Sequence, residues 1–144
     1  MNKKGFTILE IIVVVSVIAI LLGVALPRLK GMQEEAKITQ VKSELKTLQA
    51  AVEAYKIHQG SYPNVDNPPD WETSYLITAT PKIIDSELLD PFTQGAEYRY
   101  VNHGNYYVIW SVGAGDGSST LLFSNDGAVT NAGDNICVTN GSGC

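Results

Sequence analysis

The sequence has few of the residues from which enzyme active sites and metal centres are built. Its 144 residues include two histidines, His58 and His103, and two cysteines, Cys137 and Cys144. The histidines are distant from the cysteines along the chain, which argues against a zinc site. The glycine-rich segment 113–117 follows a predicted strand but opens no helix, so we interpret it as a turn rather than a phosphate-binding loop. We therefore expect no enzyme activity and no required cofactor.

Basic residues are also scarce. The chain has 10 Lys and Arg against 15 Asp and Glu, which gives a formal net charge of −5 at pH 7. Because proteins that bind nucleic acid need a basic surface for the phosphates, we expect no nucleic-acid partner. The length allows one small domain with a helical arm.

The apolar residues are concentrated near the N-terminus. Residues 11–26 carry no charge, and Ser16 is the only polar side chain among them. As a helix, residues 6–26 would extend over about 30 Å, which is enough to cross a bilayer. Lys3 and Lys4 precede this segment, which predicts that the N-terminus stays in the cytoplasm and that the remainder is exported.

An acidic residue, Glu10, lies at the start of the apolar segment. A carboxylate within a bilayer costs about 3 kcal/mol, so it is expected to have a partner and a function. The apolar segment offers no basic side chain, and we expect an amine from another subunit to be that partner. A cleaved secretory signal, with a weak site at residues 23–25, and a plain signal anchor are the alternatives, but neither accounts for Glu10.

The sequence Gly-Phe-Thr-Ile-Leu-Glu at residues 5–10 resembles the processing site of type IV pilins and of type II secretion pseudopilins. The resemblance implies that a prepilin peptidase cuts between Gly5 and Phe6 and methylates the new amine of Phe6. It implies that Glu10 then meets the N-terminal amine of a neighbouring subunit. The order Thr-Ile-Leu-Glu replaces the family's usual Thr-Leu-Ile-Glu, an isosteric exchange. The expected division is a leader at 1–5, a transmembrane and filament-core helix at 6–27, and an exported domain at 28–144.

A helical pattern continues beyond the apolar segment. Apolar residues separated by 3, 4, 3, 4 and 3 positions form one predicted stripe: Ile38, Val41, Leu45, Leu48, Val52 and Tyr55. Gly60 is expected to cap the helix, and Pro63 prevents its resumption. The sequence therefore predicts one helix from Phe6 to about Gln59 whose second half packs on a domain.

Pro27 lies inside this predicted helix. It lacks the amide that would bond the carbonyl of Gly23, and glycine is itself a poor helix former. Both weaknesses fall on one turn, so we expect a kink between Gly23 and Pro27. Local melting there during assembly is a further hypothesis, which the resemblance to related filaments supports.

The exported part has the composition of a small sheet. Strands are predicted at 98–101 and 106–112 around a turn, and at 120–124 and 128–130 around a second turn. Asp70 is expected to cap a short helix at about 71–79. The predicted fold class is α+β: a pilin fold with one long N-terminal helix, kinked near Pro27, on an antiparallel sheet of three to four strands.

The resemblance extends into this domain. Residues 89–92, 98–100 and 110–117 look like the corresponding segments of the major pseudopilin, whose C-terminal loop often binds calcium. That likeness implies Asp116, Asp126 and Asp134 as ligands of a structural calcium ion, with turn positions as the alternative for each.

The two cysteines lie close together near the C-terminus of a translocated domain. This placement predicts a disulfide between Cys137 and Cys144, with two free thiols as the alternative. A terminal cysteine pair is more typical of type IV pilins than of pseudopilins.

The predicted function is structural: a homopolymer subunit, most similar to the major pseudopilin of type II secretion. The alternatives are the major pilin of a surface pilus, for adhesion or motility, and an anchored adhesive module that binds through exposed Trp71 and Tyr75. The resemblance implies membrane lipid, the prepilin peptidase and the inner-membrane assembly machinery as partners. It places the chain in the bacterial inner membrane and then in a periplasmic pseudopilus or a cell-surface filament.

Overall fold

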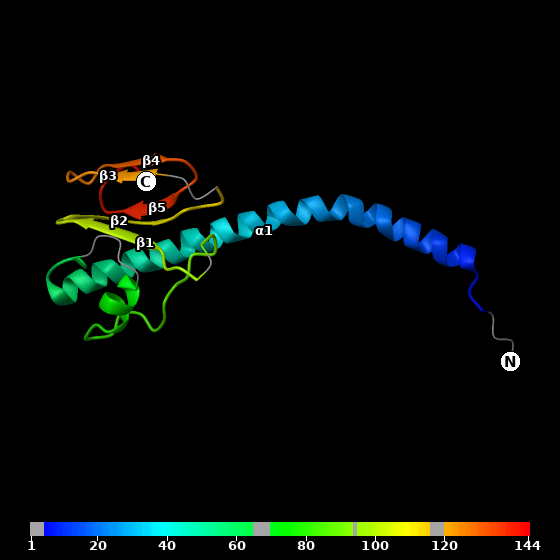
Figure 1. The fold of residues 1–144 in the computed structure, drawn as a ribbon. Helices are drawn as coiled ribbons and strands as arrows, with labels where there is room; N and C mark the ends of the chain where they lie inside the picture. The colour runs from blue at the N-terminus through cyan, green and yellow to red at the C-terminus, as the bar shows by residue number, and fades with distance from the viewer. Residues whose placement is uncertain (1–4, 65–69, 94, 116–119) are drawn as a thin grey trace. The chain divides into compact units, whose positions relative to one another are not determined.

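A computed structural model describes residues 5–64, 70–93, 95–115 and 120–144. The chain divides into two compact units, Met1–Ala36 and Lys37–Cys144, which are described separately. The helix α1 (Ile8–Gln59) contributes to both units (Figure 1).

In the first unit, α1 begins with a local cap. The amide of Glu10 donates to Thr7 Oγ1 at 3.3 Å, and the amide of Ile11 donates to the Thr7 carbonyl at 3.3 Å. These bonds satisfy amides that a helix start leaves without partners. The Ser16 hydroxyl donates to the Ile12 carbonyl at 2.7 Å, so the one uncharged polar side chain of the apolar segment is satisfied within the helix.

The helix continues through Pro27 as helix, without a break in its assignment. The expected weak turn between Gly23 and Pro27 therefore interrupts no secondary structure in the single chain. A kink angle and melting during assembly stay predictions.

In the second unit, the predicted stripe is the helix side of the core. Val41, Leu45, Leu48 and Val52 are fully buried, whereas Ile38 and Tyr55, at its two ends, are partly exposed. The helix ends as expected: Gly60 has φ +83°, and its amide donates to the Lys56 carbonyl at 2.8 Å.

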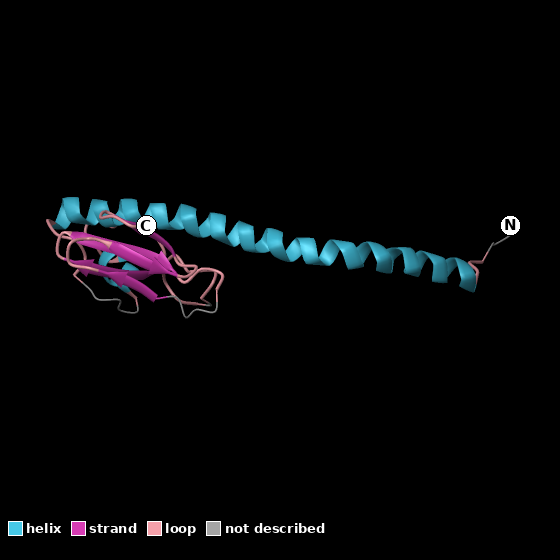
Figure 2. Cartoon of the chain, turned by 90° about the horizontal axis from the view of Figure 1, so that it is seen from above, coloured by secondary structure: helices cyan, strands magenta, loops and turns pink. Residues whose placement is uncertain are grey.

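The main sheet is antiparallel and has three strands in the order β1 (Arg99–His103), β2 (Tyr106–Ser111), β5 (Ile136–Thr139). A separate two-stranded sheet contains β3 (Thr120–Phe123) and β4 (Val129–Ala132). Both predicted hairpins are present, but they belong to two different sheets. The third strand of the main sheet comes from the C-terminus, because β5 pairs with β2 from Val108↔Thr139 to Ser111↔Ile136. The strands lie along the second part of α1 (Figure 2).

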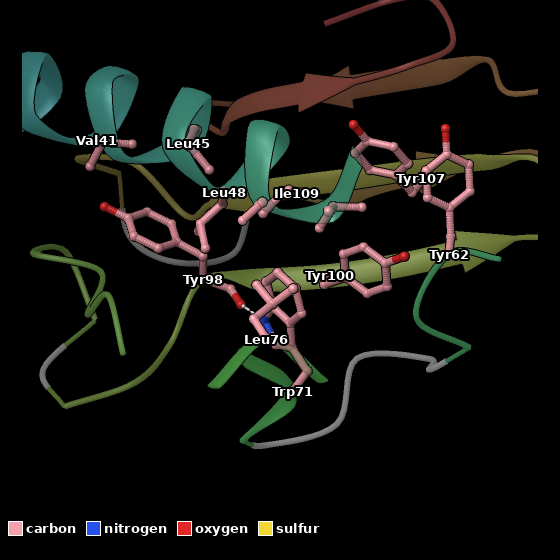
Figure 3. Close-up of a cluster of buried hydrophobic side chains, with 12 residues drawn as sticks. Val41, Leu45, Leu48, Tyr62, Trp71, Leu76, Tyr98, Tyr100, Tyr107 and Ile109 are labelled. Atoms are coloured by element: carbon pink, nitrogen blue, oxygen red, sulfur yellow. Dashed lines mark hydrogen bonds between the residues drawn. The ribbon is translucent and has the colours of Figure 1, made fainter. Parts of the chain in front are cut away.

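The main sheet buries both faces because its side chains alternate. Tyr100, Tyr107 and Ile109 face the core that α1 closes, together with Leu45 and Leu48 (Figure 3). On the other face, Val108 and Trp110 pack with residues of the β3–β4 hairpin, a second cluster that also includes Val129, Leu121, Phe123 and Cys137.

The predicted short helix is present in a different form. It is a π-helical segment, η1 (Glu72–Ile77), and no side chain caps its start. The expectation that Asp70 caps it is wrong, because Asp70 has φ +65°, outside the extended conformation that a capping residue adopts. Its carbonyl instead accepts from the amide of Ser74 at 2.9 Å.

Candidate functional site

The predicted processing site is open in the described chain. Gly5, Phe6 and Thr7 precede α1, and all three are exposed. Phe6 is 78% exposed, and a Cβ added at Gly5 would meet no atom within 4 Å. The Gly5–Phe6 bond therefore lies in an accessible segment that precedes the helix.

Glu10 lies in the first turn of α1, and its side chain is exposed. Among the described residues no side chain forms an ion pair or hydrogen bond with its carboxylate. An acidic residue at this place also interacts favourably with the helix dipole, by about 0.5 kcal/mol. That interaction is a small part of what a carboxylate within an apolar layer requires.

The helix surface around Glu10 is apolar and uncovered by its own chain. Between Ile8 and Val24, eleven large apolar side chains are at least half exposed: Ile8, Leu9, Ile11, Ile12, Val13, Val15, Val17, Ile20, Leu21, Leu22 and Val24. Within the described residues, α1 is the helix that is long and apolar enough to cross a membrane, and none of its most apolar window is buried. Such a surface needs lipid or other chains to cover it.

The carboxylates in the second part of α1 have partners. The hydroxyl of Tyr98 donates to Glu44 at 2.5 Å, and the hydroxyls of Tyr107 and Tyr62 donate to Glu53 at 2.9 and 3.1 Å. Burial, reinforced by these bonds to carboxylates, raises the pKa of Tyr98 and of Tyr107 above the ordinary value, so both remain donors. The chain thus supplies donors for Glu44 and Glu53 but offers Glu10 none among the described residues.

The predicted calcium ligands are only partly described by the structure. Asp116 lies outside the described residues. Asp126 has a turn role: its Oδ1 accepts from Ser124 Oγ at 2.6 Å and from the Ala128 amide at 3.1 Å, and these bonds lower its pKa. Asp134 lies beside the 113–115 turn, where a Cβ added at Gly115 would approach its Oδ2 to 2.8 Å. The described part of the chain contains no cluster of three acidic, histidine or cysteine side chains suited to a metal ion, and calcium stays a prediction.

The two cysteines are joined. Cys137 on β5 and Cys144 form a disulfide, and no free cysteine remains. The tail that it closes lies beside the β3–β4 hairpin, where the Val129 amide donates to the Ser142 carbonyl at 2.8 Å. The disulfide therefore fixes the tail against the hairpin, at the outer face of the main sheet.

The residues expected to serve an adhesive module are not available for binding. Trp71 is 1% exposed; its Nε1 donates to the Tyr98 carbonyl at 2.7 Å, and its ring stacks on Tyr100 with 4.6 Å between centroids (Figure 3). Tyr75 is half-buried with its ring edge on Tyr55. The expectation of an exposed Trp71 is wrong, because this side chain fills the core beneath η1.

Comparison with known proteins identifies the protein family to which the chain belongs. Residues 1–26 match the prokaryotic N-terminal methylation motif, and residues 28–126 match the family described as type II secretion system (T2SS), protein G. The chain belongs to the type II secretion protein G family. This is a family of structural pseudopilin subunits, the major pseudopilins, and not of enzymes.

Individual relatives agree with this family. The type II secretion system core protein G of Pseudomonas aeruginosa is 27% identical over 129 residues, which cover 78% of this chain and 84% of that protein. Core protein G of Klebsiella pneumoniae is 36% identical over 65 residues, 45% of this chain and 46% of the relative. Fimbrial protein EcpB of Eikenella corrodens is 38% identical over 69 residues, 48% of this chain and 43% of the relative. No solved structure matches the chain significantly.

Proposed function

We propose that this pseudopilin enters the inner membrane through residues 6–27, is cut between Gly5 and Phe6, is methylated at Phe6, and then polymerises. The observation that carries the proposal is the exposed Glu10 on an uncovered apolar helix, without a side-chain partner among the described residues. The N-terminal methylation motif matched at residues 1–26 supports the processing step.

Processing and assembly are linked by charge. Removing residues 1–5 takes away Lys3 and Lys4 and creates an amine at Phe6, so the mature end carries one cation and, four residues on, one acid. Each subunit in a stack then brings an amine to one neighbour and a carboxylate to the other. In an apolar filament core this pairing is stronger than in water, because the surrounding dielectric constant is low. An uncut chain has no such amine and should not join the filament.

The same features set the proposed location and partners. Lys3 and Lys4 hold the leader in the cytoplasm, and the exported domain follows on the periplasmic side. Lipid covers the apolar helix before assembly, and sister subunits cover it afterwards. The prepilin peptidase and the inner-membrane assembly machinery are the proposed further partners, and the product is a periplasmic pseudopilus.

Substitution of Glu10 tests this function. In the native host, Glu10→Ala and Glu10→Gln should be cut and methylated normally but should lower the yield of sheared filaments at least about tenfold, equivalent to 1.4 kcal/mol or more. Ser16→Ala is the matched control, because it removes the other polar side chain of the segment, which is satisfied within its own helix. N-terminal mass analysis separates a processing defect from an assembly defect. A normal yield of filaments from Glu10→Ala would contradict the proposal.

A surface pilus is the second candidate, favoured by the similarity to a fimbrial protein over 69 residues and by the terminal disulfide. The two functions differ in what deletion of the gene abolishes. Loss of protein secretion with intact surface filaments supports the pseudopilus. Loss of surface filaments with intact secretion supports the pilus.

A further inference from the structure

A buried acid in the exported domain lacks a full set of partners. The side chain of Glu72, the first residue of η1, is 0% exposed. Its Oε2 accepts from the amide of Leu88 at 2.8 Å, while its Oε1 is buried without a hydrogen-bond partner in the described structure. An ionised carboxylate in this state would cost several kcal/mol.

The neighbouring groups are acidic. Glu97 approaches from the segment before β1: its Oε2 accepts from the Glu72 amide at 3.2 Å, and its own Oε1 is also buried without a partner. Glu87, on the loop, accepts from the Thr73 hydroxyl. Glu44 on α1, which accepts from the Tyr98 hydroxyl, adds to the negative charge that Glu72 experiences.

No cation offsets this cluster within the described residues. Arg99 lines the same cavity as Glu87 and Glu97, together with Asp70 and Asp90, but forms no ion pair with any of them. Lys82, the nearest lysine along the chain, pairs instead with Asp85 on the surface. Glu72 and Glu97 each bury a carboxylate oxygen without a partner, so ionisation of both would cause a large repulsion, and a proton is the smallest group that relieves it.

We propose that Glu72 is a proton-dependent latch: its neutral carboxyl group fastens Leu88 to η1, and its ionisation frees the 86–89 loop from η1. The neutral form still accepts the Leu88 amide and can donate its own proton, for which the unpartnered Oε1 of Glu97 is an acceptor in the same cluster. The Leu88 amide by itself favours the anion, but desolvation and repulsion from the neighbouring acids outweigh it. The ionised side chain therefore leaves the interior, and its departure breaks the bond to Leu88.

The direction of titration agrees with this geometry. Burial raises the pKa of Glu72 to about 8, against the lowering effect of the Leu88 amide, and the charges of Glu97, Glu87 and Glu44 raise it further. Burial also raises the pKa of Glu97. Between the ordinary pKa of about 4.3 and this raised value, the folded state binds more protons than the unfolded state. Stability is therefore full at low pH and is lost as the pH rises toward and through 8.

Hydrogen exchange at the Leu88 amide tests the latch in the full chain in detergent micelles. After correction for the intrinsic exchange rate, protection of Leu88 should fall by up to about tenfold per pH unit between about pH 5 and pH 8, and level off above pH 8, where Glu72 is ionised in both states. In Glu72→Gln, which keeps an acceptor for Leu88 without a titrating group, protection should not change with pH. Asp126→Asn is the control: it removes an exposed acid and should leave the profile of Leu88 as in the unaltered chain.

Two outcomes would overturn the latch: protection of Leu88 that is constant to pH 9.5 in the unaltered chain, or the same pH dependence in Glu72→Gln. If Glu72→Gln does not fold, infrared titration of the unaltered chain decides. A protonated carboxyl band that persists at pH 6.5 and disappears above pH 9 supports the latch, and its absence at pH 6.5 refutes it.

Discussion

The apolar and acidic side chains of α1 have opposite environments in its two parts. In the first unit the large apolar side chains are exposed on all sides, and Glu10 has no side-chain partner among the described residues. In the second unit the apolar residues form one buried stripe, and tyrosine hydroxyls donate hydrogen bonds to Glu44 and Glu53. One continuous helix thus passes from a part that other molecules must complete to a part that its own domain completes.

This difference separates the requirements of folding from those of assembly. Residues such as Leu48 stabilise the domain in each single chain, because burial removes their surface from water on folding. Residues such as Leu22 gain nothing from folding of the domain and are covered by lipid or by sister subunits. Substitutions in the two parts should therefore affect different measurements.

The largest effect on folding is expected from the buried stripe. Leu48→Ala removes a fully buried side chain and should lower the free energy of unfolding by about 3 kcal/mol. Leu22→Ala makes the same chemical change at a position that is 52% exposed, and should alter it by less than about 0.5 kcal/mol. Chemical unfolding of the full chain in detergent micelles, followed by tryptophan fluorescence, measures both. Equal losses would mean that the two parts are not energetically distinct.

A smaller effect on the free energy of unfolding is expected from the hydrogen bonds that the domain donates to its acidic residues. Tyr107→Phe removes the hydroxyl that donates to Glu53 and should cost about 1–2 kcal/mol, with Tyr62 still donating to that carboxylate. Tyr106→Phe is the neighbouring control on the opposite face of β2, where the described residues offer its hydroxyl no hydrogen bond; it should cost less than about 0.5 kcal/mol. If Tyr107→Phe lowers the free energy of unfolding no more than its control does, the hydrogen bond to Glu53 does not stabilise the domain. Glu53 and Glu10 would then not differ in the way described.

Local patterns predict much of this fold. The leader junction and apolar run, the stripe from Val41 to Val52 and both hairpins follow from residue spacing and turn chemistry, which are properties of short segments. The place of β5 does not: Ile-Cys-Val-Thr at 136–139 is a short run, and its pairing with β2 depends on contacts across the intervening hairpin. The burial of Trp71 likewise depends on the docking of η1 onto Tyr98 and Tyr100, which no local pattern shows.

The candidate sites divide in the same way. Glu10 is conspicuous in the sequence because it stands in an apolar run. Glu72 is not conspicuous, because acids are common in short polar segments. Its burial becomes visible only in the structure, where it contacts the 86–89 loop and the segment before β1. The sequence could have shown only that Glu72, Glu87 and Glu97 recur in one turn-rich region, in which Lys82 and Arg99 are the nearby basic residues.

A sister subunit's new N-terminal amine can partner Glu10, as proposed above, only if the chain is cut at the Gly5–Phe6 bond. Mass spectrometry of the N-terminal peptide from filaments sheared from the native host tests it directly. We predict a chain that begins at Phe6 and carries one methyl group on that amine. A native subunit that begins at Met1, or beyond Leu26, would contradict the account, because either the amine or Glu10 itself would then be missing from the pair.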